Sequence, residues 1–252
     1  MKISIITVAY NSAATIADTL KSVSAQTHAD IEHIVIDGGS TDATLALVKA
    51  HGARVVQLVS ERDHGIYDAM NKGLALATGD AVGFLNSDDV FADVRVVERI
   101  ARALHTPGVD ACYGDLVFVD AVYVERVVRY WKSGPYRKGA CARGWMPPHP
   151  TFYARRRAYV KHGGFDVSFR MAADFEMSLR LLDIAGLHAV HIPEVLVRMR
   201  MGGASTRGLA SVVRNNRETA RACVKHGLPG GVRFVAGRVL AKVPELFRRS
   251  RA

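Results

Sequence analysis

Two adjacent carboxylates follow a short apolar segment of the chain. Asp88 and Asp89 come after the apolar run Ala81–Leu85 with only two residues between. Such a run is typical of a buried strand, and open α/β sheets bind ligands at the carboxyl ends of their strands. Two carboxylates there repel each other unless a positive charge neutralises them, and oxygen ligands suit Mg²⁺ or Mn²⁺. The pair predicts a cation site that bridges a diphosphate, and a helix N-cap is the alternative.

The segments around this pair alternate between strand and helix patterns, and they must position the carboxylates. Ile16, Leu20 and Val23 recur at helical spacing after a cap at Asn11 or Ser12. Short loops between alternating strands and helices predict a mostly parallel, doubly wound α/β sheet flanked by helices. The expected elements are strands at 2–8, 31–36, 54–59 and 81–85, and helices at 11–26, from 41 or 42, and at 66–77.

The pattern changes in the second half of the chain. Gly and Pro residues make 134–148 irregular, which in a compact domain is typical of a functional or mobile loop. A tight turn near Asp120 joins the first two strands expected there. The expected elements are strands at 111–119 and 122–130, an extended segment at 149–154, helices at 155–162 and 171–185, strands at 188–192 and 195–199, and a basic helical tail from 209.

Charge is distributed unevenly over the 252 residues, whose formal net charge is +10. Residues 126–161 hold ten basic residues and no acidic one, and residues 208–252 hold ten basic and two acidic residues. Basic surfaces attract nucleic acid, anionic lipid or phosphorylated substrates, whereas a solvated surface is the alternative for any single cluster. The acidic first half and the absence of a recognisable nucleic-acid-binding motif argue against nucleic acid as the partner.

Apolar runs and cysteines indicate the compartment. No apolar run reaches the ~18 residues of a membrane span. The N-terminal segment MKISIITVAYNS lacks the cleavage pattern of a signal peptide. Three widely spaced cysteines, Cys112, Cys141 and Cys223, fit neither a disulfide framework nor a metal site. We therefore expect a cytoplasmic protein.

Five separated motifs, taken together, resemble the family 2 glycosyltransferases over roughly residues 1–206. The segments DGGSTD and GIYDAMNKG resemble the sequences of the bacterial branch that builds exopolysaccharides and glycolipids, near the colanic-acid-type transferases. The resemblance implies a GT-A fold and the inverting, metal-dependent transfer of a sugar from a nucleoside-diphosphate sugar to a hydroxyl of a saccharide or lipid-linked acceptor. The motifs are ITVAYNSAATIADTLKSVSAQTH, IVIDGGSTDAT, DHGIYDAMNKGLALATGD with FLNSDD, HPTFYARR, and GGFDVSFRMAADFEMSLRL.

The resemblance also implies a division of the chain. Residues 1–207 correspond to the GT-A domain, in which 1–125 form the nucleotide and metal half and 126–207 form the acceptor half. Residues 208–252 are expected to form a basic helical appendage.

The metal motif of the family falls on the carboxylate pair. The resemblance implies that Asp89 contacts Mg²⁺ or Mn²⁺ and that Asp88 contacts the ribose or the sugar. Asn86 stands where many relatives carry a first Asp. One carboxylate fewer implies weaker metal binding and more reliance on the oxygens of the diphosphate.

The nucleotide is expected at the ends of the first two strands. By resemblance Thr7 and Asn11 hold it after the first strand, although a structural role suits Thr7 equally well. Asp37 ends the second strand, where relatives often have two Asp residues and the second contacts the base. Gly38 occupies that second position. Asp37 is therefore expected either to bind the base or ribose or to stabilise a turn.

Two further residues are expected near the nucleotide. Asp63 opens the loop before the helix at 66–77 and can reach the base. Lys72 can offset the charge of the diphosphate, and a solvated helix lysine is the alternative.

The fifth motif supplies the catalytic base of the family. Inverting transfer needs a carboxylate that removes the proton of the acceptor hydroxyl. Asp174 matches this position, and Ala173 precedes it where many relatives have Glu. Helix capping is the alternative role for Asp174. His149 matches a position that faces the sugar and the acceptor, with a structural histidine as the alternative.

Three other functions are weighed against this one. A nucleotidyltransferase of similar fold would carry a Gly-rich, basic loop after the first strand, and Tyr10–Ala14 has neither feature. A Rossmann dehydrogenase would have G-x-G-x-x-G there. The sequence pI of about 9.8 suggests a non-catalytic protein that binds nucleotide or nucleic acid. The acidic first half argues against that third function.

The C-terminal segment 232–251 alternates apolar and basic residues. Pro244 would break or kink a continuous helix there. A basic amphipathic segment can lie in a membrane interface. We expect either peripheral contact with the inner face of the plasma membrane, which suits a lipid-linked acceptor, or packing on the domain or on a partner.

Overall fold

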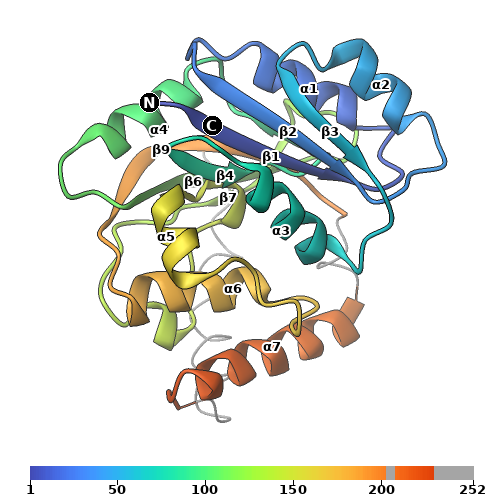
Figure 1. The fold of residues 1–252 in the computed structure, drawn as a ribbon. Helices are drawn as coiled ribbons and strands as arrows, with labels where there is room; N and C mark the ends of the chain where they lie inside the picture. Colours follow the sequence, from blue (N-terminus) through green and yellow to red (C-terminus); the bar gives the residue numbers. More distant parts are fainter. Residues whose placement is uncertain (203–207, 230–252) are drawn as a thin grey trace.

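The computed structural model describes residues 1–202 and 208–229, and Figure 1 shows a central sheet with helices packed against it. Its nine strands run in the order β3-β2-β1-β4-β8-β6-β9-β5, and β7 pairs with β6 off this path. The strands are β1 (Ile3–Ala9), β2 (Ile31–Asp37), β3 (Val55–Ser60), β4 (Ala81–Phe84), β5 (Asp89–Phe91), β6 (Ala111–Val119), β7 (Val127–Trp131), β8 (Tyr153–Arg155) and β9 (Ala189–Arg200).

Helices cover both faces of the sheet. One apolar cluster lies under α3, α5 and α6, a second lies under α4, and a third lies between the sheet and the helices α1 and α2. The helices are α1 (Ile16–Ser24), α2 (Thr44–His51), α3 (Ile66–Leu76), α4 (Val96–His105), α5 (Arg156–His162), α6 (Ala173–Ser178) and α7 (Gly208–Lys225), with short 3₁₀ turns at Cys141–Arg143 and His149–Thr151. The fold is the predicted α/β sheet flanked by helices.

The first half of the chain forms the parallel part of the sheet. β1 lies between β2 and β4, and β2 pairs with β3, all in parallel register. Every residue of β1 is buried, as expected for a strand covered on both faces. Since the strands run the same way, the loops that follow β1, β2 and β4 meet at one edge of the sheet.

The second half adds antiparallel strands beyond β4. β8 pairs with β4 and β6, and β7 forms the predicted hairpin with β6, although it begins only at Val127. The prediction of two strands at 188–192 and 195–199 is wrong, because β9 is one strand. Pro193 and Glu194 form a bulge in it, where Ile192 pairs with Gly114 and Val195 pairs with Asp115.

The remaining predicted elements differ in their bounds. The first helix begins at Ile16, after a turn, and the residues at 149–151 form a 3₁₀ turn before β8. The helix expected at 171–185 is α6, which continues as a π-helical turn over Leu179–Ile184. The sequence patterns gave no prediction of α4 or of β5.

The last described helix is part of the core. Ala222 and Cys223 of α7 are buried in the same cluster as Phe175 of α6. The basic segment at 232–251 lies outside the described residues, so its membrane role stays a prediction. None of the helices in 1–202 and 208–229 combines the length and apolar content needed to cross a bilayer.

Candidate active site

The predicted metal motif lies just after β4. Asp89 is the first residue of β5, where it pairs with Met199, and its side chain is fully buried. Neither of its carboxylate oxygens makes a hydrogen bond within the described residues. Burial, together with the charge of Asp88, raises the pKa of Asp89 well above its usual value, and nearby Arg200 partly offsets the shift. A neutral or cation-bound Asp89 is therefore favoured.

Asp88 is more accessible than its neighbour. Its side chain is only half-buried, and burial raises its pKa while Arg200 lowers it. The Oδ1 atom of Asn86 is buried and, in the described part of the chain, has no hydrogen-bond partner. Asn86 and Asp89 thus place buried oxygen atoms without donors at this strand end, next to the half-buried Asp88.

This donor set fits a hard divalent cation, because Mg²⁺ and Mn²⁺ prefer oxygen ligands. Residues 1–202 and 208–229 contain no group of three or more His, Cys, Asp or Glu side chains arranged to hold a metal ion. A cation at Asp88 and Asp89 would therefore need further oxygens, which a diphosphate and water can supply.

Arg200, which the sequence patterns did not single out, holds this loop from the end of β9. Its Nη1 donates to the Asp88 carbonyl oxygen at 2.8 Å, and its Nη2 donates to Asp18 Oδ2 at 2.6 Å. The arginine is buried, and its charge lies beside both carboxylates of the metal motif. No local pattern marks it, because it follows Asp88 by 112 residues.

Two of the predicted nucleotide residues have structural partners. Thr7 is fully buried, and its hydroxyl lies 2.9 Å from His33 Nε2 on β2. Asp37 is also fully buried, and it accepts hydrogen bonds from the amides of Gly39 and Ser40 and from the hydroxyls of Ser40 and Ser60. Thr7 belongs to the core between β1 and β2, and Asp37 fixes the turn after β2.

Asn11 joins the ends of β1 and β2. Its backbone has a φ of +48°, in the left-handed region that Asn tolerates. Its amide N–H donates to Ser40 Oγ at 2.7 Å, and its Oδ1 accepts from the amide of Thr41 at 2.9 Å. The exposed Asn11 thus lies at the mouth of the predicted nucleotide site and sets the shape of its loops.

Asp63 lies beside Gly38. A Cβ atom on Gly38 would be 2.4 Å from Asp63 Oδ2 and 3.5 Å from the ring of Tyr10. Asp63 Oδ1 accepts from the amide of Gly65 at 2.8 Å, which aims the carboxylate at this position. Tyr10, 65% exposed, is an aromatic surface that the sequence analysis did not single out. The edge of the sheet therefore carries a carboxylate and an open ring side by side.

Lys72 is paired within the same region. Its ammonium lies 2.8 Å from Glu61 and 3.6 Å from Asp68, and it donates to the carbonyl of Arg62. The hydrogen bond to Glu61 is the main reason that the pKa of Lys72 is raised. The lysine closes the loop that carries Asp63, and a diphosphate would have to compete with these partners.

Asp174 is the second residue of α6 and contacts α3. Its Oδ1 accepts from the amide of Phe175 at 2.8 Å and from the hydroxyl of Tyr67 at 3.4 Å. The same hydroxyl lies 3.0 Å from the carbonyl oxygen of Met171. Burial, and then the charge of Asp174, raise the pKa of Tyr67, so the tyrosine stays a donor. The contact holds the carboxylate in one orientation.

His149 connects Asp174 with the metal side. Its ring stacks on Phe84, the last residue of β4, at 5.5 Å between centroids, and meets Phe165 edge-on. Burial lowers the pKa of His149, and the charge of Asp174 partly offsets this shift. Neither ring nitrogen has a hydrogen-bond partner among the described residues. A neutral histidine with unpartnered nitrogens thus packs against the end of β4, near enough to Asp174 to respond to its charge.

The family model described as Glycosyl transferase family 2 matches residues 4–173, from β1 to the start of α6. The chain belongs to glycosyl transferase family 2. The matched segment includes the Asp88–Asp89 pair, Asp63 and His149, and it ends one residue before Asp174.

Bacterial members of the family are similar to this chain in sequence. An uncharacterized glycosyltransferase of Mycobacterium tuberculosis is 36% identical over 183 residues, which cover 71% of this chain and 68% of that protein. A PGL/p-HBAD biosynthesis glycosyltransferase of Mycobacterium bovis is 30% identical over 190 residues, covering 70% and 68% of the two chains.

Solved structures of similar fold confirm the GT-A architecture. Staphylococcus aureus TarS 1-349 in complex with UDP-GlcNAc matches with a TM-score of 0.73 and 18% identity over 97% of this chain and 73% of that chain. The mannosyltransferase PcManGT of Pyrobaculum calidifontis, in complex with GDP-Man and Mn²⁺, matches with a TM-score of 0.68 and 19% identity over 97% and 70%.

Proposed function

We propose that this family 2 enzyme transfers a sugar from a nucleoside-diphosphate sugar to an acceptor hydroxyl with inversion, assisted by a divalent cation. One contact carries the proposal. The stacked rings of Phe84 and His149 link the Asp88–Asp89 pair to Asp174. Phe84 leads into the Asn86–Asp89 segment, and His149 stacks on it beside Asp174. The solved UDP-GlcNAc and GDP-Man complexes of proteins with this fold support a nucleotide-sugar donor.

Asp88 and Asp89, with the Oδ1 of Asn86, would hold Mg²⁺ or Mn²⁺ together with the diphosphate. A bound cation stabilises the negative charge that develops on the departing diphosphate. Asp89 has the oxygens that need a positive partner, and the more accessible Asp88 reaches the ribose or the sugar. Arg200 fixes the backbone of this loop, so the carboxylates start from one geometry.

Asp174 acts as the base. It accepts the proton of the acceptor hydroxyl while the acceptor oxygen bonds to the anomeric carbon and the bond from that carbon to the diphosphate breaks. Attack on the face opposite the leaving group inverts the anomeric configuration. The unpartnered nitrogens of His149 can donate to or accept from the sugar or the acceptor.

The base of the nucleotide would lie at the Tyr10 and Asp63 edge. A carboxylate accepts the ring N–H of uracil, thymine or guanine, and cytosine has no such N–H. The ring of Tyr10 offers a face for stacking. Asn11 and Lys72 border this site, and Lys72 would have to exchange Glu61 for a diphosphate oxygen to bind it directly.

The acceptor is proposed to be a saccharide or a lipid-linked sugar of the cell surface, met in the cytoplasm at the inner face of the plasma membrane. Support comes from the acid-free basic stretch at 126–161 and from the basic residues of 232–251. The name of the M. bovis relative, a PGL/p-HBAD biosynthesis glycosyltransferase, is that protein's own and does not define this acceptor.

A thermal-shift screen tests the proposal. UDP, GDP, CDP and dTDP are each added with and without Mn²⁺, and a ligand at 100-fold over its Kd should stabilise the fold by ~2.7 kcal/mol. We expect one nucleotide to stabilise the wild type far more with Mn²⁺ and to lose that gain in Asp89→Asn. If none of the four stabilises the protein with or without Mn²⁺, the donor proposal fails.

A further inference from the structure

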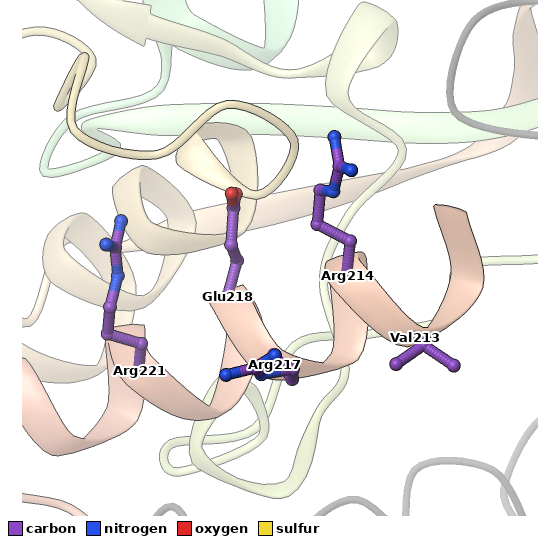
Figure 2. A pocket seen from close by; sticks show the side chains of 5 residues that line it. All are labelled: Val213, Arg214, Arg217, Glu218 and Arg221. Atoms are coloured by element: carbon purple, nitrogen blue, oxygen red, sulfur yellow. The ribbon is translucent and has the colours of Figure 1, made fainter. Parts of the chain in front are cut away.

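One face of α7 contacts the chain segment that leads to Asp174. Glu218, Arg221 and Lys225 stand at positions i, i+3 and i+7, so they project from the same side of the helix. Figure 2 shows Glu218 and Arg221 pointing to this side, with Arg214, while Arg217 points elsewhere. All three contact residues 166–172, which form the loop between α5 and α6.

Glu218 binds three consecutive backbone amides of this loop. Its Oε2 accepts from Met171 at 2.8 Å and from Ala172 at 3.0 Å, and its Oε1 accepts from Arg170 at 3.3 Å. Ala172 is the N-cap of α6 and has no side chain that can cap. Amides at a helix start lack partners within the helix, and a carboxylate also suits the positive end of the helix dipole. Glu218 therefore caps α6 from another helix.

The other two contacts fix the start of the same loop. Arg221 donates to the carbonyl oxygen of Ser168 at 2.7 Å, and its guanidinium lies 4.0 Å from the centre of the buried Phe169 ring. Lys225 lies 2.6 Å from Asp166 Oδ2. The loop is thus held at both ends by α7, and the contact nearest the reaction centre is that of Glu218.

The link from Glu218 to Asp174 is short. Met171 donates its amide to Glu218 and accepts at its carbonyl from Tyr67, whose hydroxyl also reaches Asp174 Oδ1. Asp174 lies two residues beyond the capped Ala172. A shift of this backbone would therefore move both the carboxylate and the hydroxyl that orients it.

We propose that Glu218 is a positioning residue for Asp174. The proposal rests on the proposed role of Asp174 as the base, and it makes α7 part of the catalytic unit although the family match ends at residue 173. No ion pair joins Glu218 to an arginine among the described residues, and its oxygens are used on backbone amides instead. Arg214 and Arg221 project from the same side of α7 as Glu218 (Figure 2).

Three variants test the proposal. Glu218→Ala removes the cap, and Glu218→Gln keeps one accepting oxygen with the same shape. Arg217→Ala on the same helix serves as the matched control, since its side chain lies on another face (Figure 2). The probe is hydrolysis of UDP-GlcNAc or GDP-mannose, whichever stabilises the wild type, with water in place of the acceptor.

We expect Glu218→Ala to lower kcat about tenfold to a hundredfold, since a displacement of about 1 Å can have that effect. The KM for the donor and the nucleotide-induced thermal shift should stay at wild-type values. Glu218→Gln should recover part of kcat. In the pH–kcat profile, the acid limb of Glu218→Gln should lie closer to the wild-type limb than the acid limb of Glu218→Ala does. Arg217→Ala should match the wild type throughout.

Other outcomes overturn the proposal. If Glu218→Ala has a normal kcat and a lowered melting temperature, Glu218 only stabilises the fold. If Glu218→Ala raises the KM for the donor, Glu218 acts on nucleotide binding and not on Asp174. If Glu218→Ala does not fold, a Glu218→Gln variant with wild-type kcat and pH profile overturns the proposal equally. Asp174→Asn is measured alongside, because its full activity would refute the role of Asp174 and leave the capping contact as a separate matter.

Discussion

The carboxylate of Asp63 occupies the space that a side chain at position 38 would fill. A Cβ atom on Gly38 would lie 2.4 Å from Asp63 Oδ2. Two positions 25 residues apart in sequence therefore share one volume, and only one of them can hold an acidic side chain. In this chain the carboxylate beside the nucleotide edge comes from the loop before α3 and not from the end of β2.

Asp63→Asn should weaken nucleotide binding and change base preference. The amide presents one acceptor and one donor in place of two acceptors, so uracil or guanine loses about 1 kcal/mol or more of binding free energy. Cytosine nucleotides should lose less. Titration calorimetry with UDP, GDP and CDP measures this. Gly38→Ala, which displaces Asp63 without removing it, should weaken the same nucleotides, and unchanged affinity in both variants would place the base elsewhere.

Asp89→Asn should remove the dependence on a divalent cation together with most of the activity. Loss of a group that stabilises charge in the transition state typically lowers the rate ~10²–10³-fold. Because a buried amide carries no charge, the variant should melt at or above the wild-type temperature without metal. Asp88→Asn serves as the comparison for nucleotide contact. Wild-type turnover in the presence of EDTA would rule out the metal role of the pair.

Asp174→Asn should abolish transfer and keep nucleotide binding. The substitution preserves size and the contact with Tyr67 but removes the proton acceptor. Product NMR of the wild type should show an inverted anomeric centre. Tyr67→Phe, which removes only the orienting hydroxyl, should lower kcat much less. A retained configuration in the product would exclude the single displacement at Asp174.

His33 should make the fold sensitive to acid. Burial lowers the pKa of His33 from its usual 6.5 to about 3. Between these values the unfolded chain binds a proton that the folded chain does not, so stability is complete above pH 6.5 and falls as the pH drops towards 3. The loss is up to ~5 kcal/mol at the acid limit. Urea unfolding at about pH 7.5 and about pH 4.5 measures it.

His33→Gln is the matched variant, because its amide can still meet the Thr7 hydroxyl without titrating. Its stability should fall less over the same pH range than that of the wild type. Equal losses in the two proteins would assign the acid sensitivity to other groups.

The basic C-terminal segment should draw the protein to anionic vesicles at low salt. Each basic residue near such a surface contributes ~1 kcal/mol. Replacing Arg233, Arg238, Lys242, Arg248 and Arg249 by Ser in the full chain should reduce co-sedimentation strongly. Neutral vesicles are the control. Truncation is best placed after Pro229, since a shorter chain would lose α7 and its contacts with the loop before Asp174. If the wild type and the serine variant bind anionic vesicles equally, the C-terminal segment gives no support to a membrane-associated acceptor.

The parallel half of the sheet was predictable because β1, β2 and β4 are short, mostly apolar segments between turn-forming residues. β5 was not, because three residues are too short for a pattern and its partner strand lies far along the chain. Pro193 and Glu194 made one strand look like two, since a bulge and a loop use the same residue types. In each case the missing information is a pairing between distant segments.

Site residues were predictable where the residue type alone indicates the chemistry. They were not predictable where the role of a residue depends on the direction of its side chain. Asp174 and His149 match motif positions, and the structure brings them together. Every residue of β1 is buried, so no alternation indicated that Thr7 faces His33. Asp37 ends its strand as expected, and only the loop geometry shows that its oxygens are used in the turn. Glu218 acts through backbone amides, which leave no pattern in a sequence.

The pairing of β5 with β9 also has a consequence for how the protein is made. Asp89 pairs with Met199, and the Asp88 carbonyl accepts a hydrogen bond from Arg200. Both contacts can form only after nearly the whole catalytic region has left the ribosome. Until then the nascent chain carries an unpaired apolar strand edge, the kind of surface that chaperones protect. A fragment of residues 1–125 should therefore aggregate in translation without chaperones, and adding residues 126–229 as a separate chain should restore solubility poorly.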